Sequence, residues 1–456
     1  MTKKLTLRPY QKRGLKFLKD NFGGNLFLPP GAGKTAIVSR SLSYFKKEGV
    51  GFPVLIVAPL FIIYDVWPDE LAKWSPGFKI SNLHKDKTYN PGSDIYLINP
   101  EKFRGDAKKG EKYFFDFEGI IGDESTMFKN PKAQITKVAH RFIDIVKPAV
   151  SIIMTGTPRP KSMLDLYGQV YMTMGPVLGV NFYQYRSRFF RPEFKGYNWE
   201  IEEGSEEEII RRISKKTFIM TDAEILTAGY PKSNTVDLNF HLSAPMQKKY
   251  IDFHKKLIIE MEGVRVDKSK YLMTLNKGSV NYASCSQIVN GYIYEEGKPK
   301  ILHYERLNIL ENLIESLNGS PLLVLYFHKA DLQLFKKIKA NSAILTGGMK
   351  AEEKKGILNR WNDGNIPVLY AQINITAYGL NMQSGGHNIC YFSVPDDFDK
   401  YFQSYHRLVR PGQKSSVTIH RIICKNTVDE INRLRILNKK ILKAEEFRDQ
   451  LLGVIK

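Results

Sequence analysis

The chain has 456 residues, 43% of them hydrophobic and 25% charged, so it is long enough for about two to four globular domains and is not intrinsically disordered. Lysine and arginine number 68 against 47 aspartates and glutamates, and the resulting net charge of +21 indicates a polyanionic partner, nucleic acid before an anionic membrane surface. The three cysteines, at positions 285, 390 and 424, are too far apart to indicate a disulfide framework or a cysteine zinc site.

The alternation of short apolar segments with helix-like segments predicts an α/β fold with parallel sheets covered by helices, in both halves of the chain. In the first half we expect helices at 35–46 and 69–74 and strands at 25–28, 54–58, 95–98, 119–121 and 151–155. In the second half we expect a charged helix at 428–452 and strands at 322–326, 368–371, 389–392 and 417–423. Helical insertions are expected at about 163–225 and 243–310. The Gly229-Tyr230-Pro231 turn then divides a first lobe, 1–228, from a second, 232–456.

A phosphate-binding loop is predicted between the first strand and the first helix, because a strand, a glycine-rich turn and a helix follow one another there. Its backbone N–H groups can surround phosphate oxygens, Lys34 can reach the β- and γ-phosphates, and the Thr35 hydroxyl can bind Mg²⁺. The strict eight-residue pattern begins with Gly, and Leu28 stands at that position. The plain alternative is a glycine-rich turn with a solvated lysine. The residues that we assign to the nucleotide here are Pro30, Gly31, Ala32, Gly33, Lys34 and Thr35.

A pair of carboxylates follows the expected strand at 119–121. We assign Asp123 to the metal ion and Glu124 to general-base activation of the attacking water, since hydrolases of nucleotides place acidic residues at such strand ends. An Asp-Glu pair in a solvated turn would have the same sequence.

Taken in order, these segments resemble the motifs of helicase superfamily two, and within it those of the Swi/Snf-type ATPases. The resemblance starts at Arg8 and Gln11 and continues through residues 54–59 with Trp67, the Asp-Glu box at 123–130 and the Thr-Gly-Thr-Pro string at 155–158. In the second half it covers 323–327, the string from Gly379 to Gln383, and the string from Gln403 to Gln413. The chain also resembles compact members of this family that are carried by phage genomes.

The resemblance implies two RecA-like lobes in tandem that hold ATP and Mg²⁺ in the cleft between them. It implies that Gln11 reads the adenine edge, that Arg8 and Gly379 are near the nucleotide, and that Gln403, Arg407 and Arg410 act on the γ-phosphate from the second lobe. The spacing of the last three residues, four and then three, predicts that one helical face presents them together. A solvated basic helix end is the alternative for these residues.

Relatives of this family differ from the chain at a few positions. Ser125 stands where Ala or Cys is more usual, the box lacks His, and Ala377 stands where Gly is common. In the stretch before the linker, Met220-Thr221-Asp222 replaces the usual basic string.

Nucleic acid in such proteins lies across both lobes and is gripped by its phosphates, so turns at strand ends are candidate contacts. Each candidate could equally be an ordinary turn. Basic and aromatic residues also mix at 183–191, where packing is favoured over base stacking. The candidates are Pro59, Leu60, Asn99, Lys102 and Thr157 in the first lobe, and Thr346, Gly347, Asn381 and Gln383 in the second.

The sequence thus predicts a DNA-dependent ATPase that moves along DNA, with duplex favoured, and that works as a monomer. Three alternatives stay open: a strand-separating or branch-migrating helicase, a remodeller that displaces DNA-bound protein, and a slow ATP-dependent clamp on DNA. No secretory signal core and no run of ~18 apolar residues is present, so we expect a cytoplasmic protein without a membrane partner, in the host cytoplasm if a phage encodes it.

Overall fold

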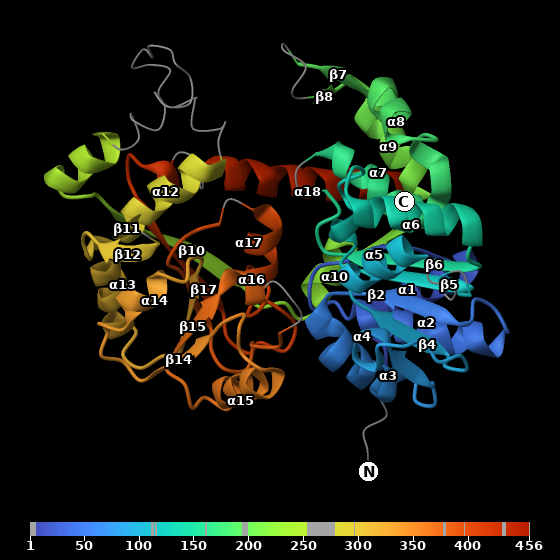
Figure 1. The fold of residues 1–456 in the computed structure, drawn as a ribbon, viewed down its shortest axis with the longest axis horizontal. Coiled ribbons are helices and arrows are strands. Elements are labelled where there is room, and N and C mark those ends of the chain that lie inside the picture. The colour runs from blue at the N-terminus through green and yellow to red at the C-terminus, as the bar shows by residue number, and fades with distance from the viewer. Residues whose placement is uncertain are drawn as a thin grey trace. The chain divides into compact units, whose positions relative to one another are not determined.

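The chain forms two compact units, which a computed structural model describes (Figure 1). Unit 1 comprises Met1–Gly229 and Leu442–Lys456, and unit 2 comprises Tyr230–Ile441. Among the residues that the structure describes, no helix has the length and apolar character to cross a membrane. The described residues are 6–110, 114, 116–159, 162–193, 199–252, 279–295, 297–376, 380–395, 397–430 and 435–455.

Unit 1 is built on a seven-stranded parallel sheet of order β3-β4-β2-β5-β6-β1-β9. Its central strands are buried along their whole length, because helices cover both faces of a parallel sheet. All carboxyl ends lie at one edge, where ligands of such sheets bind. The strands are β1 (Gly23–Phe27), β2 (Val54–Val57), β3 (Ile80–Asn82), β4 (Ile95–Ile98), β5 (Gly119–Asp123), β6 (Val150–Thr155) and β9 (Thr217–Ile219).

The helices of unit 1 follow the strands in an alternating pattern. They are α1 (Pro9–Asn21), α2 (Lys34–Lys47), α3 (Trp67–Trp74), α4 (Leu83–Asp86), α5 (Pro100–Lys109), α6 (Gln134–Val146), α7 (Leu166–Met174), α8 (Phe182–Phe189), α9 (Ser205–Ser214) and α10 (Asp222–Thr227). Shorter turns are the π-helix η1 (Ile62–Val66) and the 3-10 turns η3 (Ser125–Phe128), η4 (Met163–Asp165) and η5 (Gly175–Leu178).

The segment at 163–225, expected to be helical, also contains strands. β7 (Phe190–Pro192) and β8 (Trp199–Ile201) form an antiparallel hairpin, and β9 joins the main sheet beside β1. Three-residue strands are too short to show a hydrophobic period, which is why the pattern missed them. Within the basic–aromatic string, Tyr185, Phe189 and Phe190 are buried in the core of unit 1, whereas Tyr183 is exposed.

The end of helix α18 (Arg435–Ile455) packs into unit 1. Phe447, Leu451 and Leu452 join the same hydrophobic cluster as Leu166 of α7. The sequence placed all of 232–456 in the second lobe, and the structure differs over the last segment because these apolar side chains are buried there.

Unit 2 is built on a six-stranded parallel sheet of order β10-β17-β16-β13-β15-β14, so the predicted α/β fold with two parallel sheets in tandem is confirmed. The strands are β10 (Ser233–Phe240), β13 (Leu322–Tyr326), β14 (Ser342–Leu345), β15 (Val368–Gln372), β16 (Asn388–Tyr391) and β17 (Val417–Cys424). The helices are α12 (Ser279–Asn290), α13 (Glu305–Ser316), α14 (Asp331–Phe335), α15 (Ala351–Asn362), α16 (Ile373–Thr376) and α17 (Phe398–Tyr405).

The stretch at 243–310, also expected to be helical, contains the antiparallel hairpin of β11 (Tyr292–Glu295) and β12 (Lys298–Ile301). Residues 253–278 of this stretch lie outside the described residues.

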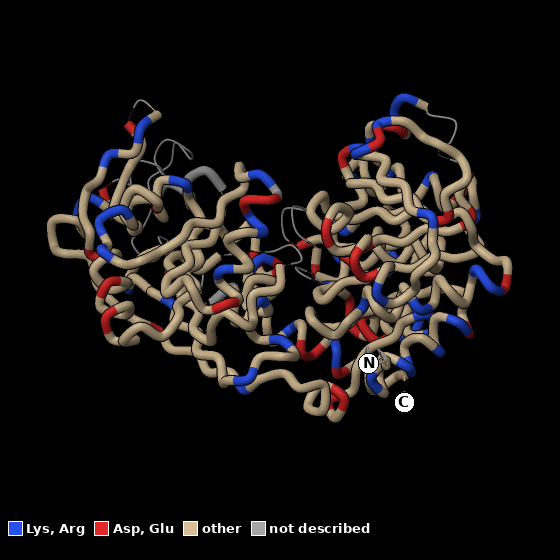
Figure 2. Tube along the Cα trace, turned by 90° about the horizontal axis from the view of Figure 1, so that it is seen from below, with Lys and Arg blue, Asp and Glu red and all other residues tan. Residues whose placement is uncertain are grey.

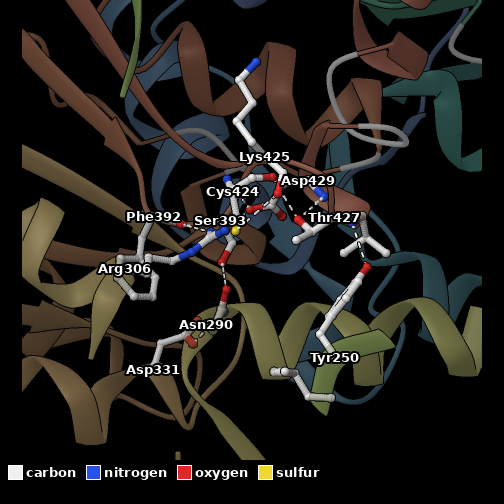
Figure 3. Close-up of polar contacts among 12 residues, drawn as sticks. Tyr250, Asn290, Arg306, Asp331, Phe392, Ser393, Cys424, Lys425, Thr427 and Asp429 are labelled. Atoms are coloured by element: carbon white, nitrogen blue, oxygen red, sulfur yellow. Dashed lines mark hydrogen bonds and ion pairs between the residues drawn. The ribbon is translucent and has the colours of Figure 1, made fainter. Parts of the chain in front are cut away.

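A buried polar network joins the strand ends of unit 2 on one face of its sheet (Figure 3). Arg306 of α13 forms an ion pair with Asp429 and donates to the carbonyl of Phe392. Asp429 also accepts the backbone N–H of Cys424 at 3.3 Å. Because these groups are fully buried, each contact offsets the cost of removing a charge from water, and the network fixes where the chain leaves β17.

Candidate nucleotide and nucleic-acid sites

The phosphate loop of unit 1 connects the end of β1 to the start of α2. Gly31 and Gly33 have φ values of 85° and 76°, a region in which a side chain would be strained. Gly33 is the N-cap of α2, so the free N–H groups of the first helical turn face the loop, as anion binding requires. The Nζ of Lys34 donates to the carbonyl of Leu28 at 2.9 Å. Leu28, where the pattern has Gly, thus contributes a backbone carbonyl inside the loop.

Helix α1 contacts this loop directly. The Gln11 amide and the Tyr10 hydroxyl both donate to the Ala32 carbonyl, each at 3.0 Å. A Cβ atom at Gly33 would lie 2.3 Å from the Gln11 Nε2, so a larger residue would displace the Gln11 amide in addition to straining the backbone. The side-chain oxygen of Gln11 accepts the backbone N–H of Arg8 at 2.9 Å. The two residues of this motif that are predicted for the nucleotide are therefore tied to the phosphate loop.

The other side of α1 is anchored to the segment that lacks the usual basic string. Arg13 donates to both carboxylate oxygens of Glu224 in α10, at 2.9 and 2.6 Å, and to the Ile219 carbonyl at 3.0 Å. The Arg8 guanidinium donates to the Ala228 carbonyl. In this chain α10 therefore helps to fix the position of α1 within unit 1.

The two strand-end carboxylates lie close to the phosphate loop. Asp123 is 6% exposed and accepts the indole N–H of Trp67 at 3.0 Å. The pKa of Asp123 is raised to about 7, chiefly by burial and in part by the charge of Glu124, against the opposing charge of Lys34. A buried carboxylate with a raised pKa fits a hard divalent cation, because Mg²⁺ prefers oxygen ligands and its charge would stabilise the ionised Asp123. Thr35, in the first turn of α2, offers a hydroxyl oxygen as a second ligand. Asp123 and Thr35 are the residues that would hold it.

Glu124 has an unusual backbone conformation. Its φ and ψ are 59° and 63°, the left-handed region, which costs about 1–3 kcal/mol for a residue other than glycine. The 3-10 turn η3 begins at the next residue, and the Met127 N–H donates to the Glu124 carbonyl at 3.1 Å. Such strain persists only where the surroundings hold it, and it concentrates at functional positions.

In unit 2 the three motif residues do not share a helix, so the predicted helical face is wrong. Helix α17 ends at Tyr405, with Gln403 inside it and Arg407 and Arg410 in the turns that follow. The helix stops because the chain turns toward Pro411 and Gly412, whose φ is 101°. The two guanidinium groups nevertheless converge. Both donate to the carbonyl of Leu380, Arg407 at 3.1 Å and Arg410 at 3.2 Å.

The loop that follows β15 and α16 is held from two sides. The Gln413 amide donates to the carbonyls of Gln383 and Gly386 at 2.8 and 2.7 Å, and the Trp361 indole donates to Met382 at 2.8 Å. Asn381 is exposed, and its carbonyl accepts the Asn362 amide at 2.9 Å. Gly379, predicted for the nucleotide, and Ala377 lie outside the described residues.

The nucleic-acid candidates of unit 1 all follow the carboxyl ends of strands of the main sheet, β4, β2 and β6, as predicted from their positions. These residues differ in their solvent exposure. Leu60 is 45% exposed and Pro59 is half-buried, whereas Asn99 and Thr157 are buried. Lys102 forms an ion pair with Asp106 at 2.9 Å. Leu60 is thus the candidate that a strand could reach without rearrangement.

Of the candidates in unit 2, only Thr346 and Gly347 directly follow a strand, whereas Asn381 and Gln383 lie in the loop after α16. Gly347 is exposed and Thr346 is half-buried after β14. The Gln383 Oε1 has no hydrogen-bond partner among the described residues, although it is buried. A buried amide oxygen without a partner is costly, so this side chain is available to a donor from a ligand.

Three residues at these sites were not assigned roles by sequence reasoning. Trp67 was recognised in a motif, but nothing in the pattern showed that its indole would reach Asp123. Tyr10 and Gln169 act on the phosphate loop and on the turn of Ser125 through single hydrogen bonds. Each of these roles depends on a contact that the fold creates between distant segments. The spacing of residues along the chain does not indicate such a contact.

Comparisons with known proteins match the same segments. The family described as Type III restriction enzyme, res subunit, matches residues 4–160, and the one described as Helicase conserved C-terminal domain matches 305–412. A protein of Acyrthosiphon pisum secondary endosymbiont phage 1 is 27% identical over 97% of this chain and 98% of its own length.

Cellular relatives are longer. An uncharacterized ATP-dependent helicase of Mycoplasma pneumoniae is 25% identical over 94% of this chain but only 41% of its own length. A SWI/SNF-related matrix-associated actin-dependent regulator of chromatin subfamily A-like protein 1 homolog of Caenorhabditis elegans is 25% identical over 97% of this chain and 63% of its own. Among solved structures, the Sulfolobus solfataricus SWI2/SNF2 ATPase core in complex with dsDNA is 21% identical, covers 99% of this chain and 97% of that chain, and has a TM-score of 0.46.

Proposed function

We propose that this chain, which belongs to helicase superfamily two as a Swi/Snf-type ATPase, hydrolyses ATP in a DNA-dependent reaction and uses it to move along duplex DNA. One observation carries the nucleotide part. Unit 1 brings the phosphate loop and the strand-end carboxylates together, so that Asp123 lies within electrostatic reach of both Lys34 and Glu124. That is the arrangement a nucleotide hydrolase needs.

In the proposed reaction, water attacks the γ-phosphorus of ATP, Glu124 accepts the proton, and ADP leaves with inorganic phosphate. Lys34 and the N–H groups of the phosphate loop hold the phosphates in place. Mg²⁺, bound at Thr35 and Asp123, would neutralise charge on the β- and γ-phosphate oxygens. Arg407 and Arg410 of unit 2 would stabilise the charge that develops on the transferred group.

The proposal that DNA is the partner rests on the net charge of the chain and on the names of its relatives. The net charge is +21, and lysine and arginine occur along both units (Figure 2). Relatives include a Chromodomain-helicase-DNA-binding protein 1-like of Mus musculus and a DNA repair and recombination protein RAD54-like of Danio rerio, whose names favour DNA over RNA. Binding to DNA phosphates does not depend on the base sequence, and it weakens steeply as the salt concentration rises.

Steady-state ATP hydrolysis tests the proposal. We would measure it without nucleic acid and with blunt duplex DNA, single-stranded DNA, forked DNA and RNA, each at two salt concentrations. We expect blunt duplex to stimulate most, with stimulation falling at high salt. Displacement of the third strand from a DNA triplex would then report movement without strand separation.

Stimulation by single strands or forks alone would replace the duplex translocase with a strand-separating or branch-migrating enzyme. Hydrolysis that no nucleic acid stimulates would contradict DNA dependence.

A further inference from the structure

Helix α7 carries a buried glutamine that joins two of the segments described above. Gln169 has no solvent exposure. Its side-chain oxygen accepts the hydroxyl of Ser125 at 2.8 Å, and its amide donates to the carbonyls of Pro158 at 2.8 Å and Asp165 at 2.7 Å. The side-chain amide of Gln169 therefore forms hydrogen bonds with three segments: the turn that follows the carboxylates, the loop after β6, and the residue that precedes its own helix.

The neighbouring residue explains how α7 comes so close. A Cβ atom at Gly168 would lie 2.1 Å from the Phe128 carbonyl oxygen and 2.9 Å from Thr136, so only glycine allows this approach. The Gly168 carbonyl in turn contacts the His140 ring at 3.0 Å. The helix thus docks by its backbone onto η3, the turn that begins at Ser125, and this places Gln169 beside the hydroxyl.

We propose that Gln169 is a positioning residue for the hydrolytic step, an inference that rests on the proposed function. Through Ser125 it holds the strained backbone of Glu124, and through Pro158 it ties that turn to the loop carrying Thr157. Ser125 is buried and directly follows Glu124, so fixing its hydroxyl restricts the left-handed conformation that aims the general base.

The same contact accounts for an unusual residue of the box. A serine replaces the common Ala or Cys at position 125, and a buried hydroxyl is costly unless it is hydrogen-bonded. Gln169 provides the partner. Ser125 and Gln169 should therefore act as one unit, in which losing either member gives the same defect.

The test uses the full chain with saturating duplex DNA and four variants. Q169M keeps the side-chain size without the amide, S125A removes the hydroxyl, and S125A/Q169M removes both partners. Q134M, on the exposed start of α6, is the matched control. For each we would measure kcat and KM for ATP, the Kd of a fluorescent ATP analogue, and Tm.

We expect Q169M and S125A each to lower kcat about tenfold, the size of effect seen when a supporting partner of a catalytic group is lost. The Kd of the analogue should change less than about twofold, and the double variant should be no slower than Q169M, since coupled residues are not additive. If Q169M does not fold, the kcat of S125A alone tests the inference.

Three results would overturn the inference: an unchanged kcat in S125A or Q169M, a fall in kcat matched by an equal loss of nucleotide affinity, or losses that add in the double variant. Failure of the proposed function is a separate result, because the unaltered chain would then hydrolyse no ATP or would hydrolyse it without stimulation by DNA.

Discussion

At the scale of single residues, Glu124 combines the position of a general base with a backbone held away from its preferred conformation. Replacing it by Gln keeps shape and backbone but removes the group that accepts the proton. We expect E124Q to lower kcat by about 10²-fold or more, the usual contribution of a general base. ATP binding should be retained, because Lys34 and the phosphate loop are unchanged.

Turnover under saturating ATP and DNA, together with binding of a fluorescent ATP analogue, measures both quantities. E207Q is a suitable control, since Glu207 lies on the exposed face of α9. Normal turnover in E124Q would remove Glu124 from the role of base.

His420 predicts an acid sensitivity of unit 2. It lies within β17, is 8% exposed, and neither ring nitrogen has a hydrogen-bond partner among the described residues. Burial lowers its pKa below the ordinary value. The unfolded chain therefore binds a proton that the folded chain resists, and stability is lost as the pH falls from about 6.5 toward the lower folded pKa.

Replacing His420 by Leu removes this proton uptake, so the difference in Tm between pH 7.5 and pH 5.5 should become smaller in H420L. The exposed His241 provides a control, and H241L should keep the difference of the unaltered chain. If H420L and H241L lose stability equally on acidification, then His420 does not cause the sensitivity.

At the scale of elements, the sequence predicted the interior of each sheet and missed its edges. The nine central strands are mostly apolar because helices bury both their faces, and such segments are visible without any structure. Within the two main sheets, the strands that the pattern did not predict, β3, β9, β10 and β14, are the outermost ones. β10 is mostly exposed and β9 has only three residues, so neither carries a hydrophobic pattern.

The motif residues also divide into those whose positions the sequence predicted and those whose positions it did not. Spacing predicted a glycine-rich loop between β1 and α2 and an acidic pair at the end of β5, and the structure has both there, because backbone and strand geometry fix them locally. It failed for Arg407 and Arg410, whose convergence on Leu380 depends on a turn and on a contact 27 and 30 residues away in sequence.

The end of α18 should stabilise unit 1, although it is distant in sequence. Leu451 is 1% exposed and lies in the hydrophobic cluster of that unit. We expect L451A to lower the free energy of unfolding by about 2–5 kcal/mol, since it loses buried methyl groups and leaves a cavity. Leu442, 59% exposed on the same helix, is the matched control, and L442A should change stability by less than about 0.5 kcal/mol.

Urea unfolding followed by tryptophan fluorescence would measure both variants. The chain has four tryptophans, and their fluorescence reports the unfolding of the units. Trp67 and Trp74 lie in α3 of unit 1. Equal stability of L451A and L442A would contradict the packing of α18 in this cluster.

At the scale of the whole molecule, the groups proposed for one reaction are divided between two units that each fold around their own sheet. Unit 1 holds the phosphate loop and the carboxylates, and unit 2 holds the arginines. Arg407 is 4% exposed and also donates to the Gln403 carbonyl at 2.9 Å, so it supports the turn itself. Arg410 is half-buried, so as a residue it is more exposed than Arg407.

We therefore expect R410A to lower kcat by roughly 10³-fold, as the loss of an arginine finger does, while the affinity of unit 1 for ATP changes less than about threefold. R410K should recover little, because an ammonium group cannot grip phosphate oxygens in a bidentate way. Arg360, exposed on α15 of the same unit, is the control for lost charge. Since R410A alters no residue of unit 1, a slow variant that still binds ATP would mean that hydrolysis requires both units. If R410A and R360A hydrolyse ATP equally well, unit 1 is sufficient for hydrolysis without this arginine, and the coupling of ATP to movement must arise elsewhere in the chain.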